Sequence, residues 1–445
     1  MSASDRSLNR RSALRRLAAA AGAGIAAPGV FRTHGAVPPS ETVYHASFGA
    51  SGMAGADIGS LTASKHLKLV AVADVDLRNT FQIIKRFPGV KVYQDWRQLL
   101  EKEKHLDSVN VSTPDHMHGP ITLSALERGL NVYTQKPLTQ TIHEAREVAH
   151  LARDRKVVTQ MGIQLHSSAI HQTIAATVRA GTIGKVKEVH SWSGKHWGDT
   201  KPRPDRKDPV PAGLDWDAWL GVAEERPFIA GYYHPGEWRK RLDFGTGTFG
   251  DMGCHILDPV FMALALTSPR SVHSEGGAPN ADNWGLDSQV KYTFPGTAIT
   301  VDPFVLYWYD GDRRPTAEVK ALIGKPALQD QGSIYIGEKG VLYAPYFDEP
   351  LLLPAGHFSK NALVHADGAD HYLQFVEACR GNGKTSAPFD YSGPLTESVL
   401  LGCLATRFPR TNLDWDAAGL AVTNVSDANR FVRRQYRKGW GPLGR

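Results

Sequence analysis

Short apolar runs alternate with helix-like runs between residues 43 and 163, and this alternation constrains the fold more than any other feature of the sequence. The run 67–74, LKLVAVAD, is almost continuously apolar, as a strand buried on both faces requires. Amphipathic runs at 119–129 and 141–154 separate further short, strand-like segments. This pattern is typical of a doubly wound α/β domain, in which helices cover both faces of a parallel sheet. We expect such a domain over residues 41–163.

The pattern changes in residues 164–445. A helical run at 169–180 is followed by runs in which apolar or aromatic residues alternate with polar ones. A period of two predicts an open, mainly antiparallel sheet with one exposed face. We therefore expect a C-terminal α+β domain that contributes to substrate binding. Because a large exposed apolar face is usually covered, we also expect a homo-oligomer, either a dimer or a tetramer.

Residues 1–40 differ from the rest of the chain in charge. They hold six arginines, no lysine and one acidic residue, and so carry +5 of the net charge of +6. The basic balance therefore does not indicate a nucleic-acid partner. A charged start and an apolar stretch at 17–31, too short to span a bilayer, are typical of a signal peptide. The pair Arg10–Arg11 resembles a twin-arginine signal, which predicts a periplasmic protein without a stable membrane span. The alternative is a cytoplasmic protein with a weakly helical N-terminus.

A glycine-rich turn, FGASGMAG, follows the first strand-like run and opens a helix-like run, as in a dinucleotide-binding fingerprint. Gly49 begins the fingerprint, and Ser51 replaces its middle glycine. Gly52 offers a close backbone approach instead, and the amides from Met53 onward would meet a pyrophosphate. Asp74 ends the second strand, where a carboxylate accepts from a ribose hydroxyl and repels a 2′-phosphate. The sequence therefore predicts a Rossmann domain that binds NAD in preference to NADP.

Two further motifs, STPDHMHG at 112–119 and YTQKPL at 133–138, end predicted parallel strands. Ligands of open α/β sheets bind at that edge. These motifs add Thr113, Pro114, His118, Gln135 and Lys136 to the expected cofactor contacts. Lys136 is also a candidate cation beside the nicotinamide or a substrate hydroxyl. The alternative is a surface lysine in a tight turn.

The segment TFGDMGCH places Asp251 and His255 one helical turn apart, on one helix face. Spacing alone fits a helix-capping aspartate and a core histidine equally well. Asp258 follows, but a catalytic zinc needs three protein ligands, and we expect no metal. Cys254 lies off that face and is expected in the core. None of the three cysteines forms a C-x-x-C pair, which excludes a disulfide scaffold.

From residue 41 onward the chain resembles the Gfo/Idh/MocA superfamily, which includes glucose–fructose oxidoreductase and inositol dehydrogenase. Within that superfamily, its amino-acid sequence is most similar to the exported branch. Three family motifs carry the resemblance, each with one substitution: Thr113–His118 with Asp115 for Asn, Gln135–Pro137 with Gln135 for Glu, and Gly245–His255 with Thr246 for Gly. The resemblance implies a Rossmann domain joined to a C-terminal domain with an open sheet.

The resemblance also implies a catalytic constellation of Lys136, Asp251 and His255. His255 would act as the base for a substrate hydroxyl, and Asp251 would orient it. Lys136 would stabilise the alkoxide charge that develops as the proton leaves.

Aromatic and polar residues elsewhere suit a sugar or polyol, whose rings have an apolar face and a hydroxylated rim. Taken singly, each of these residues is better explained by packing. Together they predict a carbohydrate pocket formed by His166, Lys195, Trp197, Tyr232, Trp238 and Arg239.

Three functions remain open at this point. The first is an oxidoreductase that takes hydride from a secondary hydroxyl of a sugar or polyol. The second is a glycoside hydrolase or lyase that oxidises the sugar transiently and then returns the hydride. Export favours a tightly bound cofactor in either enzyme, because the periplasm lacks a free nicotinamide pool. The third is a sugar-binding protein with a relic nucleotide site, against which the set Lys136, Asp251 and His255 argues.

Overall fold

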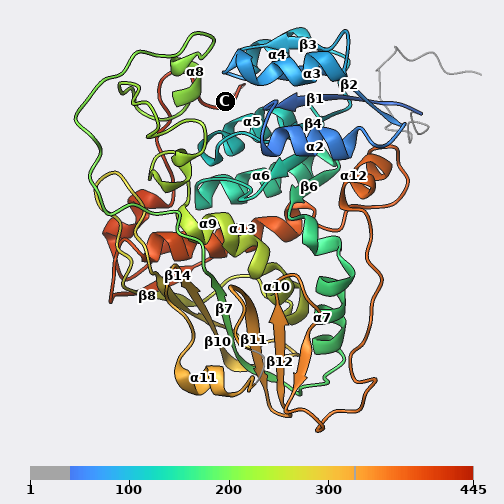
Figure 1. Ribbon diagram of the computed structural model, residues 1–445, viewed down its shortest axis with the longest axis vertical. Coiled ribbons are helices and arrows are strands. Elements are labelled where there is room, and N and C mark those ends of the chain that lie inside the picture. The colour runs from blue at the N-terminus through green and yellow to red at the C-terminus, as the bar shows by residue number, and fades with distance from the viewer. Residues whose placement is uncertain (1–40, 325–326, 444–445) are drawn as a thin grey trace, which may run out of the picture. The chain divides into compact units, whose positions relative to one another are not determined.

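The structure is a computed structural model that describes residues 41–324 and 327–443 (Figure 1). The signal peptide predicted for residues 1–40 lies outside these residues. Within the described part, no helix combines the length and apolar character that a membrane span needs.

The first of two sheets confirms the predicted doubly wound architecture. Among the described residues it has six strands, all parallel, in the order β3-β2-β1-β4-β5-β6. The strands are β1 (Val43–Phe48), β2 (Leu67–Ala73), β3 (Lys91–Tyr93), β4 (Ser108–Val111), β5 (Asn131–Gln135) and β6 (Thr159–Gly162). The order reverses direction between β1 and β4, which creates the crevice where ligands of such sheets bind.

Helices connect these strands. They are α2 (Met53–Leu61), α3 (Phe81–Arg86), α4 (Trp96–Lys102), α5 (Asp115–Glu127) and α6 (Ile142–Arg155). A capping box formed by Thr141 and Glu144 starts α6. Helix α5 begins at Asp115, earlier than the expected run at 119–129, because Pro114 has the backbone geometry of a helix N-cap. His118 therefore lies in the first turn of a helix and not in a loop.

The second sheet confirms the expected open, mainly antiparallel arrangement. In the described ranges it has nine strands in the order β13-β12-β11-β7-β10-β9-β8-β14-β15, and only β7 and β10 run parallel. The strands are β7 (Val186–Ser193), β8 (Ser271–Glu275), β9 (Gln289–Phe294), β10 (Thr300–Asp310), β11 (Gln331–Gly337), β12 (Val341–Pro345), β13 (Leu351–Leu353), β14 (Asn412–Asp416) and β15 (Ala421–Val422).

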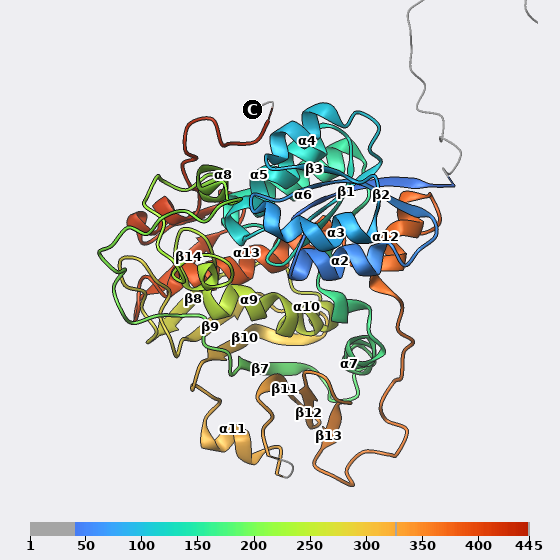
Figure 2. The same ribbon diagram turned by 45° about the horizontal axis from the view of Figure 1, so that its top comes forward.

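Two helices, α9 (Gly247–Ile256) and α13 (Phe389–Ala405), lie between the sheets (Figures 1 and 2). Helix α13 contacts α6 on one side and α9 on the other, and α9 contacts β7, β10 and β11. The other helices of this half are α7 (Ala169–Arg179), α8 (Trp216–Leu220), α10 (Asp258–Leu264), α11 (Ala317–Ala321) and α12 (His371–Cys379). Phe249 of α9 stacks on Trp308 of β10, with 4.5 Å between ring centroids. Helix α9 is thus fixed between the sheets, close to the first sheet's carboxyl edge.

Short 3₁₀ turns complete the structure at Leu77–Thr80, Gln164–Ser167, Glu237–Lys240 and Ser426–Phe431. The turn at Glu237–Lys240 contacts α9. It therefore brings a loop of the second half against the helix that carries Asp251.

Candidate active site

A cleft of about 270 Å³ lies at the carboxyl ends of β1, β2 and β4. One side is the edge of the first sheet, with Gly49, Ser51, Gly52, Met53, Asp74, Asn79, Thr113 and Pro114. The opposite side comes from the loop region after β7, with Ala218, Trp219, His234, Trp238 and Arg239. Residues predicted for the cofactor and for the substrate thus line one continuous cleft.

The glycine-rich turn crosses tightly over the end of β4. Gly49 has φ +100°, and a Cβ there would lie 2.7 Å from the carbonyl oxygen of Ser112. Gly52 also has positive φ, +55°, but open space surrounds it. Gly52 is the N-cap of α2, and no side chain among the described residues caps that helix. Its first amides are therefore free to bind an anionic group such as a pyrophosphate.

Asp74 lines the cleft and also holds the turn in place. Its carboxylate accepts from the backbone amides of Ala50 and Asp76, each at 2.9 Å, and from the amide of Asn79 at 3.2 and 3.3 Å. Burial raises the pKa of Asp74 above its usual value, although these bonds act against the shift. The carboxylate anchors the glycine-rich turn at the position that the fingerprint predicts.

Lys136 and Asp251, far apart in the sequence, meet across the two halves of the chain. Nζ of Lys136 donates to Oδ1 of Asp251 at 2.6 Å and to its carbonyl oxygen at 2.9 Å. Lys195 Nζ lies 3.4 Å from Oδ2, and Arg239 Nε lies 3.5 Å from Oδ1. Burial acts to raise the pKa of Asp251, but Lys136, Lys195 and Arg239 together hold it well below its usual range. The carboxylate is ionised and surrounded by cations.

His255 lies one turn along α9 from Asp251. Its ring is partly exposed, but Nδ1 is buried and has no hydrogen-bond partner among the described residues. Burial, followed by the charge of Lys136, lowers the pKa of His255 to about 3. The imidazole is therefore neutral in the fold. A ring of Tyr346 meets it edge-on, with centroids 6.2 Å apart.

The expected orienting role of Asp251 is not what the geometry supports. Within the described residues, the side-chain contacts of Asp251 go to cations, and none goes to His255. Residues one turn apart share a helix face, but a carboxylate interacts more strongly with a nearby cation than with a neutral imidazole. Asp251 positions Lys136 instead.

Two predicted cofactor residues hold the loop of Lys136 in place and do not line the cleft. The ring nitrogens of His118 lie 2.7 Å from the carbonyl oxygen of Pro137 and 2.8 Å from that of Thr113. His118 thereby ties the two strand-end motifs together. The amide of Gln135 donates to both oxygens of Asp57 at 3.0 Å. Asp57 is a buried carboxyl group whose pKa burial raises to about 6, so it needs such donors.

Two predicted substrate residues, Lys195 and Arg239, contact the carboxylate of Asp251, and two more, Trp197 and Trp238, lie against Arg239. Besides the contacts of Lys195 and Arg239 with Asp251, the Arg239 guanidinium lies 4.3 Å from the ring centroid of Trp238 and 5.5 Å from that of Trp197. Tyr232 does not join them, because its ring packs in a buried cluster and its hydroxyl donates to Asn283 at 2.9 Å.

Comparison with known families decides the assignment. Residues 46–163 match the NAD-binding Rossmann-fold domain of the Gfo/Idh/MocA oxidoreductase family, and residues 166–303 match its C-terminal α/β domain. The chain belongs to this family. The family's two domains follow each other here in the order that the fold displays.

Individual relatives of this Gfo/Idh/MocA chain are distant. The levoglucosan dehydrogenase of Pseudarthrobacter phenanthrenivorans is 22% identical over 191 residues, 43% of this chain and 40% of that protein. The inositol 2-dehydrogenase of Rubrobacter xylanophilus is 30% identical over 127 residues, 28% of this chain and 36% of that protein. The chain thus spans about two fifths of the length of these curated relatives.

A solved structure shares the fold over most of the chain. The WlbA dehydrogenase of Chromobacterium violaceum, determined with NADH and UDP-GlcNAcA, has a TM-score of 0.61 and 16% identity. The match covers 86% of this chain and 99% of that one. At this identity the likeness establishes the fold alone.

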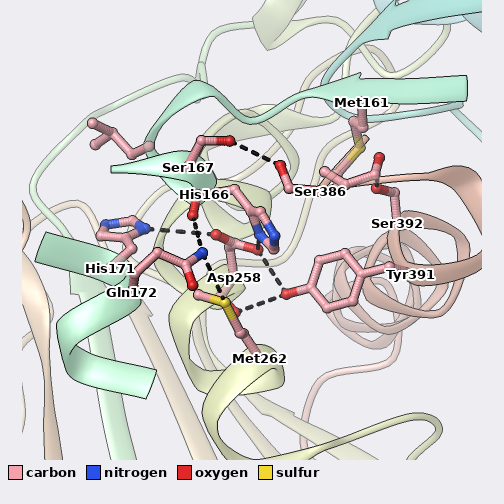
Figure 3. Close-up of polar contacts among 12 residues, drawn as sticks. Met161, His166, Ser167, His171, Gln172, Asp258, Met262, Ser386, Tyr391 and Ser392 are labelled. Carbon is pink, nitrogen blue, oxygen red and sulfur yellow. Dashed lines mark hydrogen bonds and ion pairs between the residues drawn. The ribbon is translucent and has the colours of Figure 1, made fainter. Parts of the chain in front are cut away.

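His166, another predicted substrate residue, lies in a sealed polar cluster (Figure 3). Its Nδ1 is 2.7 Å from Oδ1 of Asp258, and the hydroxyl of Tyr391 donates to the same oxygen at 2.7 Å. His171 Nδ1 lies 3.5 Å from Oδ2 of Asp258. All three side chains around Asp258 are buried or nearly so. His166 therefore contacts a buried carboxylate and not the cleft.

Some residues at the site escaped the sequence analysis. Tyr346 follows the end of β12, and no periodicity or motif marks it. Asn79 lies in a short turn after β2, and only its contact with Asp74 reveals its part in the cleft. Asp258 was considered only as a metal ligand. In the described ranges, the three potential ligands that come within 4.8 Å of one another are His196, Asp287 and Asp312, and Asp258 is not among them.

Proposed function

We propose that this protein is a nicotinamide-dependent oxidoreductase that takes hydride from a secondary hydroxyl of a sugar or polyol. The observation that carries the proposal is the contact between Lys136 and Asp251 beside a neutral His255, next to a cleft with a dinucleotide-binding turn. Family membership supports the reaction type. The two curated relatives, named for levoglucosan and inositol, support the substrate class.

The cleft residues fit a dinucleotide. Gly49 permits the tight turn, and the amides after Gly52 would bind the pyrophosphate. We propose NAD over NADP, because a 2′-phosphate would approach the carboxylate of Asp74. The nearby Arg78 is engaged by both oxygens of Asp76. When bound, the nicotinamide supplies the hydride acceptor.

The protein's own residues then handle the proton and the charge. In alcohol oxidation the C–H electron pair leaves as hydride, the O–H proton leaves, and a C=O bond forms. His255 is the proposed proton acceptor, because its imidazole is neutral and lies one helical turn from Asp251, which binds Lys136. Lys136 uses two of its three N–H groups on Asp251, and the third is available to an alkoxide. Asp251 fixes the direction of that ammonium group.

Turnover with isolated components tests this proposal. Purified protein is given NAD or NADP and a panel of sugars and polyols, and reduced nicotinamide is measured by absorbance. We expect reduction with NAD and a sugar, and its loss in the Lys136→Met variant. Lys187→Gln, on an exposed position of β7, serves as a matched control and retains turnover. Equal turnover in wild type and Lys136→Met contradicts the proposed role.

A second function, redox-neutral glycoside cleavage through a transient keto-sugar, is favoured by one sequence observation. The twin-arginine-like pair Arg10–Arg11 supports export to the periplasm, where an enzyme must keep and recycle its nicotinamide. We therefore propose a tightly bound cofactor. Nicotinamide that copurifies with the protein, and release of a chromogenic aglycone without added NAD, would favour this function. Stoichiometric cofactor reduction by free sugars favours the dehydrogenase.

We also propose a homo-oligomer assembled through the open face of the second sheet. On that face the rings of His190 and Tyr307 stack with centroids 4.6 Å apart, and Tyr307 stacks on Tyr309 at 6.3 Å. Light scattering on the purified protein tests this. A monomer at micromolar concentration contradicts it.

A further inference from the structure

The candidate active site has more positive than negative charge. Lys136, Lys195 and Arg239 each lie within 4.0 Å of Asp251, and in the described part of the chain none has another carboxylate at that distance. The single carboxylate of Asp251 thus forms ion pairs with three cations. These four side chains therefore carry three positive charges against one negative charge.

Neighbouring basic residues differ, because each has a carboxylate partner other than Asp251. Lys240 pairs with Glu237 at 2.7 Å, and Arg241 pairs with Asp199 at 3.0 Å. The excess around Asp251 is therefore not shared by Lys240 and Arg241, the two basic residues that follow Arg239.

Among the residues that the structure describes, no nearby group cancels the excess. The carboxyl group of Asp115 interacts electrostatically with Lys136 and Arg239, but it is buried and accepts from Thr246 at 2.6 Å. Burial raises the pKa of Asp115, which weakens its negative charge. His255 contributes no negative charge in any protonation state.

Lys195 and Arg239 are also accessible. Their side chains are 43% and 29% exposed, whereas the side chain of Lys136 is 14% exposed. The segment that carries Lys195 is tied to α9, because Thr248 Oγ1 donates to its carbonyl oxygen at 3.2 Å. Arg239 is held against the rings of Trp197 and Trp238 and lines the cleft. Both cations are thus presented beside Lys136, on segments anchored by these contacts.

We propose that the sugar substrate carries an anionic substituent, a carboxylate, sulfate or phosphate, which Lys195 and Arg239 bind. The inference rests on the proposed function and names the substrate class of the same site. Arginine offers paired N–H groups that match such an oxyanion, and lysine adds a point charge. The cofactor's pyrophosphate does not need these residues, because the free amides of α2 are available to it.

Matched ligand pairs test the inference by binding and by turnover. The ligands are methyl glycosides of gluco, galacto and manno configuration, each with C6 as hydroxymethyl or as carboxylate. The 6-sulfate and 6-phosphate of each sugar distinguish the sources of the anion. Calorimetry measures binding to the NAD-saturated protein at low and high salt, and absorbance of reduced nicotinamide measures turnover.

We expect at least one anionic ligand to bind ten-fold or more tightly than its neutral partner. The ratio of the two affinities should fall as the salt concentration rises. Lys195→Gln and Arg239→Gln each lower that ratio about ten-fold. The control Lys187→Gln leaves it unchanged.

Each outcome separates the inference from the function. If no anionic ligand binds better than its neutral partner, or if both variants keep the wild-type ratio, the inference is overturned. A loss of NAD affinity in Arg239→Gln with an unchanged ratio also overturns it, because Arg239 then serves the cofactor. If the enzyme oxidises sugars but does not prefer anionic over neutral ones, the proposed function is supported and the inference is overturned. If anionic glycosides bind more tightly than neutral ones but no nicotinamide is reduced, the inference is supported and the proposed function is contradicted.

Discussion

Asp251 on α9 and Asp258 at the start of α10 are two buried carboxylates in one short stretch, yet their surroundings differ. They are 6% and 1% exposed, and the pKa of each lies well below the usual range despite burial. Asp251 is surrounded by long cationic side chains, two of them open to solvent. Asp258 is surrounded by two imidazoles and a phenol in a closed cluster (Figure 3).

The difference teaches that burial and a shifted pKa do not by themselves mark a reactive group. Flexible cations can exchange Asp251 for a ligand, whereas the rings around Asp258 have no access to one. Perturbed carboxylates occur in structural networks as well as in catalytic sites. Access and the chemistry of the partners support the proposed role of Asp251 in the reaction and a structural role for Asp258.

The largest expected effect is on turnover in the His255→Ala variant. Loss of a positioned base lowers the rate about a hundred- to ten-thousand-fold. Equilibrium dialysis should find NAD binding retained, since the ring is not part of the glycine-rich turn. Unchanged turnover in His255→Ala would contradict the proposed role of His255.

A large effect on stability is expected at the other carboxylate. Asp258→Asn removes an anion that a histidine and a tyrosine contact in the closed cluster, and should cost about 3 kcal/mol of unfolding free energy. Asp251→Asn should cost less, because Lys195 and Arg239 can turn toward solvent. Urea unfolding of both variants compares them. A larger stability loss in Asp251→Asn contradicts the division into reactive and structural groups.

The pH dependence of stability should have opposite signs at the two histidines that accompany these carboxylates. The folded pKa of His255 is about 3, so this ring destabilises the fold progressively as pH falls below 6.5. Burial alone would lower the pKa of His166, but Asp258 raises it. His166 therefore contributes stability that is complete below 6.5 and is lost as pH rises through its folded pKa.

Unfolding free energies measured from pH 7.5 down to about pH 4.5 check these signs. Relative to wild type, His255→Asn should become more stable on acidification and His166→Asn less stable. The same sign for both variants contradicts the assignment.

The smallest effect separates the two imidazoles of the closed cluster. His166 lies at hydrogen-bond distance from Asp258, whereas His171 lies at 3.5 Å and makes no hydrogen bond to it. His171→Asn should therefore cost about 1 kcal/mol less than His166→Asn. Thermal unfolding of the two variants at one pH measures the difference, and an equal loss would show that the contacts are equivalent.

The sequence predicted the fold well where its signals were long. The apolar run at 67–74 and the amphipathic run at 141–154 became β2 and α6 almost as expected. The strands β3 and β8 were not anticipated. β3 is short and partly exposed, and β8 pairs with the following strand β9 and with β14, which comes from a distant part of the chain. Such strands depend on pairing and not on local pattern.

The site was predictable only in part. Lys136 and Asp251 were grouped through motifs of a resembling family, and their contact at 2.6 Å arises from the packing of α9 between the sheets. The sequence predicts Gln135 at the cofactor and His166 at the substrate. In the structure, both side chains instead form hydrogen bonds with buried carboxylates. Sequence spacing does not reveal which buried group needs a donor, because that depends on tertiary packing.

Isotope transfer from sugar to nicotinamide tests the proposed hydride transfer itself. The protein is incubated with NAD and methyl glycosides, neutral and anionic, that carry deuterium at every ring carbon, and its nicotinamide is then analysed by mass spectrometry. We expect deuterium in the nicotinamide of the wild-type protein and at most a trace in His255→Ala. Absence of deuterium in the wild-type protein with every sugar that binds would contradict the account.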